Sequence, residues 1–165
     1  EVITIDGNVA ATLKGTIGAD NLAGNDGADT IEGREGADTL TGGNRQDTFV
    51  FSSGDTGILE TEADTITDFV SGNDLIDLSS ISSGNIGTYV EVNGTANDFA
   101  TFTANATNSF SGSDIDIYVE YNLDGSGNTY VFVDENKSGG VSAGDTLLVL
   151  TGLASADSID SSDFV

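Results

Sequence analysis

Aspartate recurs at nine-residue intervals between positions 15 and 50, each time at the same place in a glycine-rich phrase. The four phrases are GTIGADNLA (15–23), GNDGADTIE (24–32), GREGADTLT (33–41) and GGNRQDTFV (42–50). Their sixth positions are Asp20, Asp29, Asp38 and Asp47. Carboxylates and the carbonyls of glycine-rich turns offer oxygen alone, which suits Ca²⁺ better than Zn²⁺ or the strictly octahedral Mg²⁺. The chemistry that this spacing indicates is calcium binding.

The other columns of the phrase describe the element that must position these carboxylates. Glycine fills position one in every phrase and position four in three of them, and a large apolar residue fills position eight. Six residues with two glycines favour a tight turn with positive φ, and three residues with one inward apolar side chain favour a short strand. Two phrases complete one coil, so residues eighteen apart should stack. The predicted stacks are Leu22 on Leu40, Ile31 on Phe49, Asp20 on Asp38 and Asp29 on Asp47.

These columns resemble the RTX (repeats-in-toxin) family of bacterial secreted proteins, whose nonapeptides bind calcium in a parallel β-roll. The resemblance implies several bound calcium ions, three or more, because stacked carboxylates repel one another unless a cation lies between them. The alternative is a glycine-rich turn array whose acids are simply solvated. The candidate ligands in the four phrases are Gly15, Ile17, Gly18, Asp20, Gly24, Asp26, Gly27, Asp29, Gly33, Glu35, Gly36, Asp38, Gly42, Asn44 and Asp47.

The pattern fades on both sides of the four phrases. Upstream, DGNVAATLK (6–14) keeps an apolar residue at Leu13 but has Ala11 in the aspartate column, so it predicts a coil without a complete site. The apolar residues of EVITI (1–5) are expected to cap the open end of the roll, which repeat arrays require.

Downstream, Asp64 begins a "DTI" phrase seventeen residues after Asp47, and we interpret 59–67 as a further coil edge with Asp64 as a ligand. Asp55 stands in a weaker, similar relation to Asp38. The stretch 64–79 resembles the segment after the roll in the C-terminal domain of serralysin-type metalloproteases. That resemblance implies Asp64 as a calcium ligand and Asp68 as a further candidate. Asp74 and Asp77 are expected to hydrogen-bond turns.

From about residue 86 the glycine interval gives way to alternating apolar and polar residues, which predicts antiparallel strands. The predicted strands are 88–92, 98–104, 114–121, 129–133 and 146–150, with a hairpin loop at 122–128. The predicted fold is therefore all-β. A parallel β-roll over 1–82 is followed by an antiparallel β-sandwich cap over 83–165.

The loop DENKSGGVSAGD (134–145) has the spacing of an EF-hand calcium loop. Asp134, Asn136, Ser138 and Asp145 fall at its positions one, three, five and twelve. It differs in ending with Asp, a shorter arm than the usual Glu, and in having flanks that read as strands. Two interpretations stay open: a calcium loop, or a long hairpin rich in turn residues.

Composition restricts the partners and the chemistry. Against 28 acidic residues stand Lys14, Arg34, Arg45 and Lys137, giving a formal net charge of -24. Like charge disfavours nucleic acid and anionic membranes. With no His or Cys in the chain, imidazole and thiolate chemistry are excluded. Paired carboxylates can hydrolyse glycosides, but metal binding already accounts for the regular aspartates, so we expect a non-catalytic module whose parent protein is free to be an enzyme.

The ends of the sequence bear on its origin. No stretch reaches transmembrane length, and the first residues do not read as a signal peptide. A start without Met indicates a fragment or a processed product. The last residues, Asp163, Phe164 and Val165, resemble the C-terminal tail of substrates of ABC-type (type I) secretion systems, and a final edge strand there is compatible with that role.

Together these features predict a calcium-binding C-terminal module of a larger secreted bacterial protein. It would fold on extracellular calcium and be exported by ABC-type machinery that reads its tail. The alternative is a surface-layer or adhesin module that self-assembles at the cell surface in a calcium-dependent way. Both place the chain outside the cell or at its surface, without membrane insertion.

Overall fold

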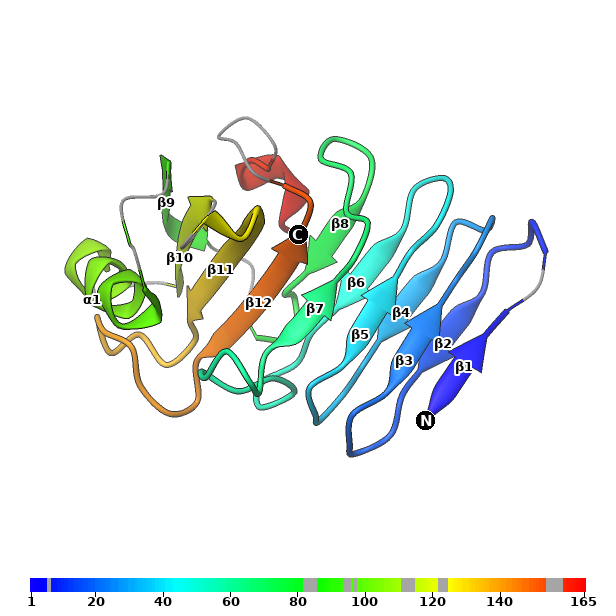
Figure 1. Cartoon of the computed structure of the whole chain (residues 1–165), viewed down its shortest axis with the longest axis horizontal. Helices are drawn as coiled ribbons and strands as arrows, with labels where there is room; N and C mark the ends of the chain where they lie inside the picture. The colour runs from blue at the N-terminus through cyan, green and yellow to red at the C-terminus, as the bar shows by residue number, and fades with distance from the viewer. Residues whose placement is uncertain are drawn as a thin grey trace.

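Two β-sheets build the molecule, and the chain alternates between them throughout its N-terminal half (Figure 1). This computed structural model describes residues 1–5, 7–81, 86–93, 96, 98–110, 115–121, 125–153 and 159–165. One sheet has the strand order β2-β4-β6-β8, and the other has the order β1-β3-β5-β7-β12-β11-β10-β9. The odd and even strands of the first eight therefore lie in different sheets, as a roll requires.

The strands of the roll are three residues long, and all their pairings are parallel. Their register confirms the predicted coil: Leu22 pairs with Leu40 and Ile31 pairs with Phe49. The middle residue of β2 to β6 is buried in each case, because it is the one side chain of the strand that faces inward. The strands are Val2–Thr4 (β1), Thr12–Lys14 (β2), Asn21–Ala23 (β3), Thr30–Glu32 (β4), Thr39–Thr41 (β5), Thr48–Val50 (β6), Asp64–Ile66 (β7) and Leu75–Asp77 (β8).

The degenerate first phrase continues the roll as predicted. β2 pairs with β4, and Leu13 is 2% exposed at the end of the apolar stack. β1 pairs with β3, and Ile3 and Ile5 pack against the core, whereas Val2 is 76% exposed. The segment before the first repeat thus adds a strand to the roll and covers part of its open end.

The C-terminal half extends one sheet of the roll. β12 pairs in parallel with β7, and the antiparallel pairs β12–β11 and β11–β10 follow. The expected antiparallel strands are therefore present, and they lie in the same sheet as β1, β3, β5 and β7 (Figure 1). The predicted domain boundary at 82/83 falls outside the described residues. The elements are Ile86–Asn93 (β9), Phe99–Ser109 (α1), Ile115–Tyr121 (β10), Asn128–Asp134 (β11), Thr146–Thr151 (β12) and the short 3-10 helix Ser161–Asp163 (η2).

The strand predicted at 98–104 is wrong, because residues Phe99–Ser109 form α1. Asp98 caps the helix by accepting a hydrogen bond from the amide of Thr101 at 2.7 Å. Phe102 and Ala106, four residues apart, are both fully buried, which is helical spacing. The expectation that β9 is antiparallel is also wrong: it pairs with β10 in parallel, since a connection containing a helix can return the chain to the same edge in the same direction.

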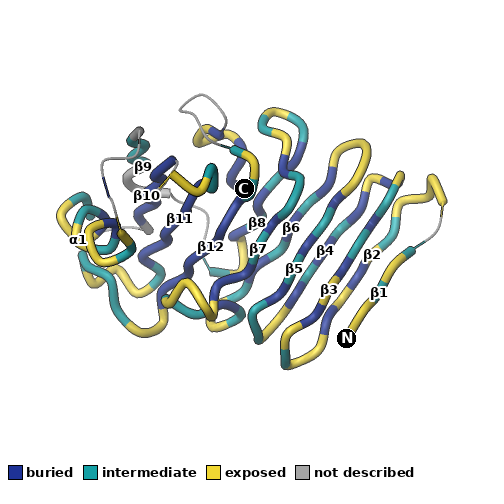
Figure 2. Tube along the Cα trace, viewed as in Figure 1, coloured by how far each residue is buried: buried dark blue, intermediate teal, exposed yellow. Residues whose placement is uncertain are grey.

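Two apolar clusters fill the molecule on opposite faces of the long sheet. The larger one lies between the sheets of the roll and continues under β10 to β12. The smaller one lies beneath α1, where Phe102 contacts the rings of Tyr118, Tyr130 and Phe132. Figure 2 shows this arrangement as buried strand centres joined by largely exposed turns. Of the helices that the structure describes, none has the length and apolar character to cross a membrane.

Candidate metal centre

Along one edge of the roll, each aspartate accepts a hydrogen bond from the coil before it. Oδ1 of Asp29 accepts from the amide of Ala11 at 2.8 Å, and Oδ1 of Asp47 accepts from the amide of Asp29 at 2.8 Å. Oδ1 of Asp74 then accepts from the amide of Asp47 at 3.0 Å. The result is a column of carboxylates one coil apart, with Ala11 as its end.

The opposite edge repeats the arrangement. Oδ1 of Asp38 accepts from the amide of Asp20 at 2.8 Å, and Oδ1 of Asp64 accepts from the amide of Asp38 at 2.8 Å. The predicted stacks of Asp20 on Asp38 and of Asp29 on Asp47 are thus present. We call Asp20, Asp29, Asp38, Asp47, Asp64 and Asp74 the ladder aspartates.

Four ladder aspartates hold an oxygen that has no hydrogen-bond partner although it is buried. These are the Oδ2 atoms of Asp29, Asp38, Asp47 and Asp64, in side chains that are at most 2% exposed. A buried, unpaired carboxylate oxygen is costly, and more so beside other carboxylates. The cost disappears if a cation contacts these oxygens, so the ladder fits a metal ion that takes oxygen ligands.

Asp20 also has a buried oxygen without a hydrogen bond, Oδ1, but it differs from these four because that oxygen forms an ion pair with the amino group of Glu1. Oδ2 accepts from the amide of Thr16 at 2.5 Å, and Oδ1 lies 2.6 Å from the amino group of Glu1. These bonds, with the amino group of Glu1 contributing most, lower the pKa of Asp20.

The position-one glycines make room for the unpaired oxygens. A Cβ on Gly42 would lie 2.5 Å from Oδ2 of Asp47, and a Cβ on Gly24 or Gly33 would collide with Oδ2 of Asp29 or Asp38. The turns contain positive φ, as expected, but the position-one glycines do not carry it. It falls at position two, on Asn25, Arg34 and Gly43, and at position four, on Gly36 and Arg45. Position one therefore requires glycine for space and not for its backbone freedom.

Burial and like charge raise the pKa of several ladder aspartates in the metal-free chain. Desolvation raises the pKa of Asp47 to about 6, with the charges of Asp74, Asp29 and Asp68 adding to it. Desolvation raises the pKa of Asp64 to about 8, and the charges of Asp38 and Asp55 act in the same direction. The pKa of Asp38 is also raised, mainly by burial. A bound cation would favour the charged form of these carboxylates and offset both effects.

Within the described residues, no three acidic side chains come close enough to hold an ion by themselves. A calcium ion, which takes six to eight oxygens, would therefore need backbone carbonyls of the turns as well. The position-three candidates Ile17, Asp26, Glu35 and Asn44 all have exposed side chains, so a ligand role for them would fall to their backbone carbonyls. Ile17 is 81% exposed, and Nδ2 of Asn44 donates to Asp26 Oδ1 at 2.6 Å at the surface.

Asp64 takes a different place from the one that its spacing to Asp47 suggested. It lies below Asp38, twenty-six residues earlier, and Asp74 occupies the place below Asp47. Asp74 was expected to hydrogen-bond a turn, and its Oδ2 does accept a hydrogen bond from the amide of Val70 at 2.9 Å. Its ladder role was missed, although "DLI" at 74–76 repeats the Asp-x-apolar part of the nonapeptide.

The neighbouring aspartates act as caps. Asp68 accepts from the amides of Gly42 and Gly43 at 2.9 and 2.8 Å, so it replaces the strand carbonyl that a regular next coil would present there. Asp77 accepts from the amide of Ser79, as expected, and Asp55 accepts from the amide of Ser52.

The loop 134–145 connects β11 to β12, and the oxygens of its aspartates are occupied. Asp134 accepts from the amides of Ser138 and Gly139, at 3.1 and 2.9 Å. Asp145 accepts from Nδ2 of Asn136 at 2.8 Å and from the amide of Ser142 at 2.7 Å. This network describes a hairpin closed by its own side chains, and calcium binding in it stays a prediction.

The C-terminal tail is folded onto the roll. Phe164 is 5% exposed and forms a parallel bridge with Ile76. Asp163 is 1% exposed and accepts from Ser71 Oγ at 2.7 Å and from the amide of Gly72 at 2.8 Å. The tail thus extends the sheet of β8 by a single residue.

Short parallel strands, two sheets and carboxylates stacked at each turn define a calcium-binding β-roll. The family model of the RTX calcium-binding nonapeptide repeat matches residues 14–49, in four copies. The chain therefore carries an RTX β-roll, as its sequence indicated, and RTX repeats bind calcium. No curated protein matches the chain.

Among solved structures, the chain is similar to two subunits of a mannuronan C5-epimerase from Azotobacter vinelandii. The AlgE6R2 subunit is 26% identical with a TM-score of 0.52, over 96% of this chain and 89% of that one. The AlgE6R3 subunit is 24% identical with a TM-score of 0.33, over 94% of this chain and 80% of that one. The likeness to AlgE6R2 extends across both halves of the chain, and so supports the roll and the C-terminal sheet as one recurring arrangement.

Proposed function

We propose that this chain is a calcium-triggered folding module of a larger secreted bacterial protein. The observation that carries the proposal is the set of unpaired, buried Oδ2 atoms on Asp29, Asp38, Asp47 and Asp64. A roll that closes around uncompensated carboxylates is unstable, so we expect the metal-free chain to remain unfolded. Bound calcium supplies the positive charge between successive turns.

The free energy of calcium binding is large enough to decide whether the chain folds. A ligand that binds the folded chain alone stabilises it by about 1.4 kcal/mol per site when its concentration is about tenfold above Kd. Extracellular calcium modules have Kd values of about 10⁻⁴–10⁻³ M. Three or more such sites would then contribute an amount comparable to the stability of a small domain.

The position of the tail supports export before folding. Phe164 and Asp163 are buried against the last coil, so secretion machinery could reach them only while the roll is open. A low-calcium cytosol would keep the tail accessible, and folding outside the cell would withdraw it. We therefore infer that an ABC-type exporter would read the tail in the unfolded chain.

Circular dichroism of the chain in chelator and in calcium tests the proposal. We expect a coil spectrum in chelator that converts to β on addition of millimolar Ca²⁺, with much less conversion at equal Mg²⁺, which demands stricter geometry. A chain that shows the same folded spectrum in chelator and in calcium would rule out a calcium-triggered module.

A second candidate is calcium-dependent self-assembly at a cell surface. Three apolar side chains are largely exposed on the first coil, namely Val2 at 76%, Val9 at 75% and Ile17 at 81%. Together with β1 and β2, which are the outermost strands of the two described sheets, they offer a surface on which another copy could stack. Light scattering separates the candidates: a monomer in calcium favours the folding module, and large calcium-dependent oligomers favour assembly.

A further inference from the structure

A hollow of about 540 Å³ lies beside α1, on the face of the long sheet that this helix covers. Two loops complete it, namely 51–63 and 134–145. Several of its lining residues also pack against the apolar cluster beneath α1, so the hollow borders that cluster. A volume of this size lies within the usual range for binding sites, roughly 300–1,000 Å³. Its apolar walls are Ile58, Leu59, Phe99, Ala104 and Val141.

Two threonines of α1 that line the hollow use their hydroxyls elsewhere. Thr103 Oγ1 donates to the carbonyl of Ala100 at 3.0 Å, and Thr107 Oγ1 donates to the carbonyl of Thr103 at 2.9 Å. Thr107 Oγ1 also accepts from the amide of Val141 at 3.3 Å, which fastens loop 134–145 to the helix. Because these hydroxyls are engaged with the backbone, the hollow offers a guest, apart from Asn108, carbon rather than hydrogen-bond partners.

The walls of the hollow are only partly covered by the rest of the chain. Leu59 is 50% exposed, and Ala104 and Thr107 are also exposed. The helix that carries the last two, Phe99–Ser109, contains no charged residue, although charged residues make up 19% of the whole chain. A concave apolar surface that stays uncovered in so charged a molecule is a feature of interaction sites.

Two exposed carboxylates stand next to this uncharged surface. Glu60 follows the wall residue Leu59, and Asp98 precedes the wall residue Phe99. Glu60 accepts a hydrogen bond from the hydroxyl of Tyr130 at 2.6 Å, and the ring centroids of Tyr130 and Phe99 are 6.3 Å apart. These contacts place the carboxylate of Glu60 at the rim of the hollow.

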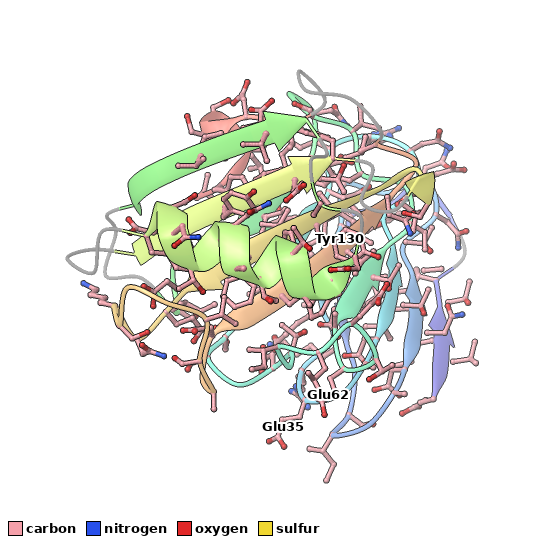
Figure 3. The ribbon with its side chains drawn as sticks, turned by 60° about the vertical axis from the view of Figure 1, so that its left-hand side comes forward. Glu35, Glu62 and Tyr130 are labelled. Carbon is pink, nitrogen blue, oxygen red and sulfur yellow. The ribbon has the colours of Figure 1, made fainter. Side chains whose placement is uncertain are left out.

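The elements around the hollow are acidic as a group. Figure 3 faces α1 and shows Tyr130 beside the helix and Glu62 on the loop 51–63. The two loops and the N-cap of α1 carry seven acidic residues and one basic residue, so a positively charged partner would be attracted here. The acidic residues are Asp55, Glu60, Glu62, Asp98, Asp134, Glu135 and Asp145, and the basic residue is Lys137.

We propose that the hollow beside α1 binds a segment of a partner protein that presents an apolar side chain flanked by lysine or arginine. The apolar side chain would lie against Leu59, Phe99 and Ala104 and displace water from their carbon surface. The flanking cations would face Glu60 and Asp98, and the net charge of -24 would speed the approach of the segment. No ladder aspartate lines the hollow, so this contact goes beyond the calcium-triggered folding proposed above.

Other occupants fit these walls less well. A second copy of the chain carries the same net charge of -24, and like charge opposes its approach. A sugar would lose hydrogen bonds to water that the engaged hydroxyls of Thr103 and Thr107 do not replace. Apolar walls with an acidic rim therefore favour a basic segment with an apolar anchor.

Peptide binding to the folded, calcium-saturated chain tests the proposal. The probe is a labelled hexapeptide with blocked ends, KKFLKK, and its controls are KKSSKK, without apolar side chains, and EEFLEE, with reversed charge. Leu59→Ser removes one wall. Its matched control is Val70→Ser, because Val70 does not line the hollow and is 52% exposed, against 50% for Leu59. Ala104→Arg places a cation in the hollow, and Ala10→Arg adds the same charge at an exposed position of the first coil.

We expect fluorescence anisotropy to show that KKFLKK binds roughly tenfold or more tightly than either control peptide. Leu59→Ser and Ala104→Arg should each remove most of that difference, whereas Val70→Ser and Ala10→Arg should keep it. Circular dichroism in calcium checks that every variant folds. Equal affinities for KKFLKK and KKSSKK, equally tight binding of EEFLEE, or equal losses within a matched pair would overturn the proposal. Any of these results would leave the proposed function intact, because calcium-triggered folding is measured without peptide.

Discussion

The ladder aspartates of the roll and the aspartates of loop 134–145 both follow a calcium-ligand spacing, but their oxygens are used differently. Oδ2 of Asp38 and Oδ2 of Asp47 are buried without a partner, whereas Asp134 and Asp145 use both oxygens in hydrogen bonds within their own loop. The first arrangement is incomplete without a cation and the second is complete. Hydrogen-bond satisfaction therefore separates two motifs that the sequence presents as similar.

The largest effect should come from filling the space beside an unpaired oxygen. In Gly42→Ala the new Cβ would lie 2.5 Å from Oδ2 of Asp47, so either the turn or the carboxylate must move. We expect the free energy of unfolding in saturating calcium to fall by about 3 kcal/mol, measured by urea denaturation.

Gly18→Ala is the matched control for that substitution. It is also a turn glycine of the repeat, but a Cβ there meets no atom within 4 Å and its φ is ordinary. Its stability should stay within about 1 kcal/mol of the unmodified chain. Equal losses in the two variants would contradict the role that we assign to position one.

A smaller effect, with a sign that depends on calcium, should follow from removing one ladder charge. Asp38→Asn keeps an acceptor for the amide of Asp20 but loses the charge. With calcium about tenfold above Kd, stability should fall by about 1.4 kcal/mol as one site is lost. In chelator the same variant should retain more β signal in circular dichroism than the unmodified chain, because a repelling charge is gone.

Asp134→Asn tests the same question in loop 134–145, where we expect no dependence of stability on calcium. It replaces one of two oxygens that accept backbone amides, so we expect a loss of about 1 kcal/mol. That loss should be the same in saturating calcium and at the lowest calcium concentration at which the chain still folds, as followed by urea denaturation. A loss that grows with the calcium concentration would mean that loop 134–145 also binds the ion.

The raised pKa values of the ladder aspartates should make the metal-free chain more stable at low pH. Asp47 and Asp64, with pKa values raised to about 6 and about 8 from the usual 3.8, hold protons in the folded state that the unfolded chain has already released. Stability is therefore greatest below about pH 4 and is lost as the pH rises towards 8. Between pH 5 and 7 we expect a fall on the order of 2 kcal/mol.

This pH effect is measured as the β signal of chain stripped of calcium on a chelating resin. Saturating calcium should remove it, because the ion binds the deprotonated carboxylates and gains affinity as the pH rises. A metal-free chain that gains structure as the pH rises would show that the ladder carboxylates are not the groups that oppose folding.

Much of the roll could be predicted because its information is local and repeated. Each phrase carries its own turn glycines, carboxylate and inward apolar residue, so the register of Leu22 on Leu40 follows from counting. Counting fails once the turns change length. Asp64 was therefore predicted from its spacing to Asp47, although the loop 51–63 places it one coil after Asp38.

The C-terminal half was predicted less well because its pairing is not local. Threonine and phenylalanine in 98–104 favour strand by propensity, and the strand prediction relied on that preference. The signals that it left out were the N-cap at Asp98 and the helical spacing of Phe102 and Ala106. Missing the helix led to the wrong direction for β9. The antiparallel partners β10, β11 and β12 were identified because short connections and alternating patterns specify them nearby in the sequence.

Anomalous diffraction from crystals grown in millimolar calcium tests the central claim most directly. The account predicts calcium peaks along both edges of the roll, within coordination distance of the Oδ2 atoms of Asp29, Asp38, Asp47 and Asp64. It predicts the weakest signal or none beside Asp134 and Asp145. Well-ordered crystals with no ion beside any of those four Oδ2 atoms would contradict it.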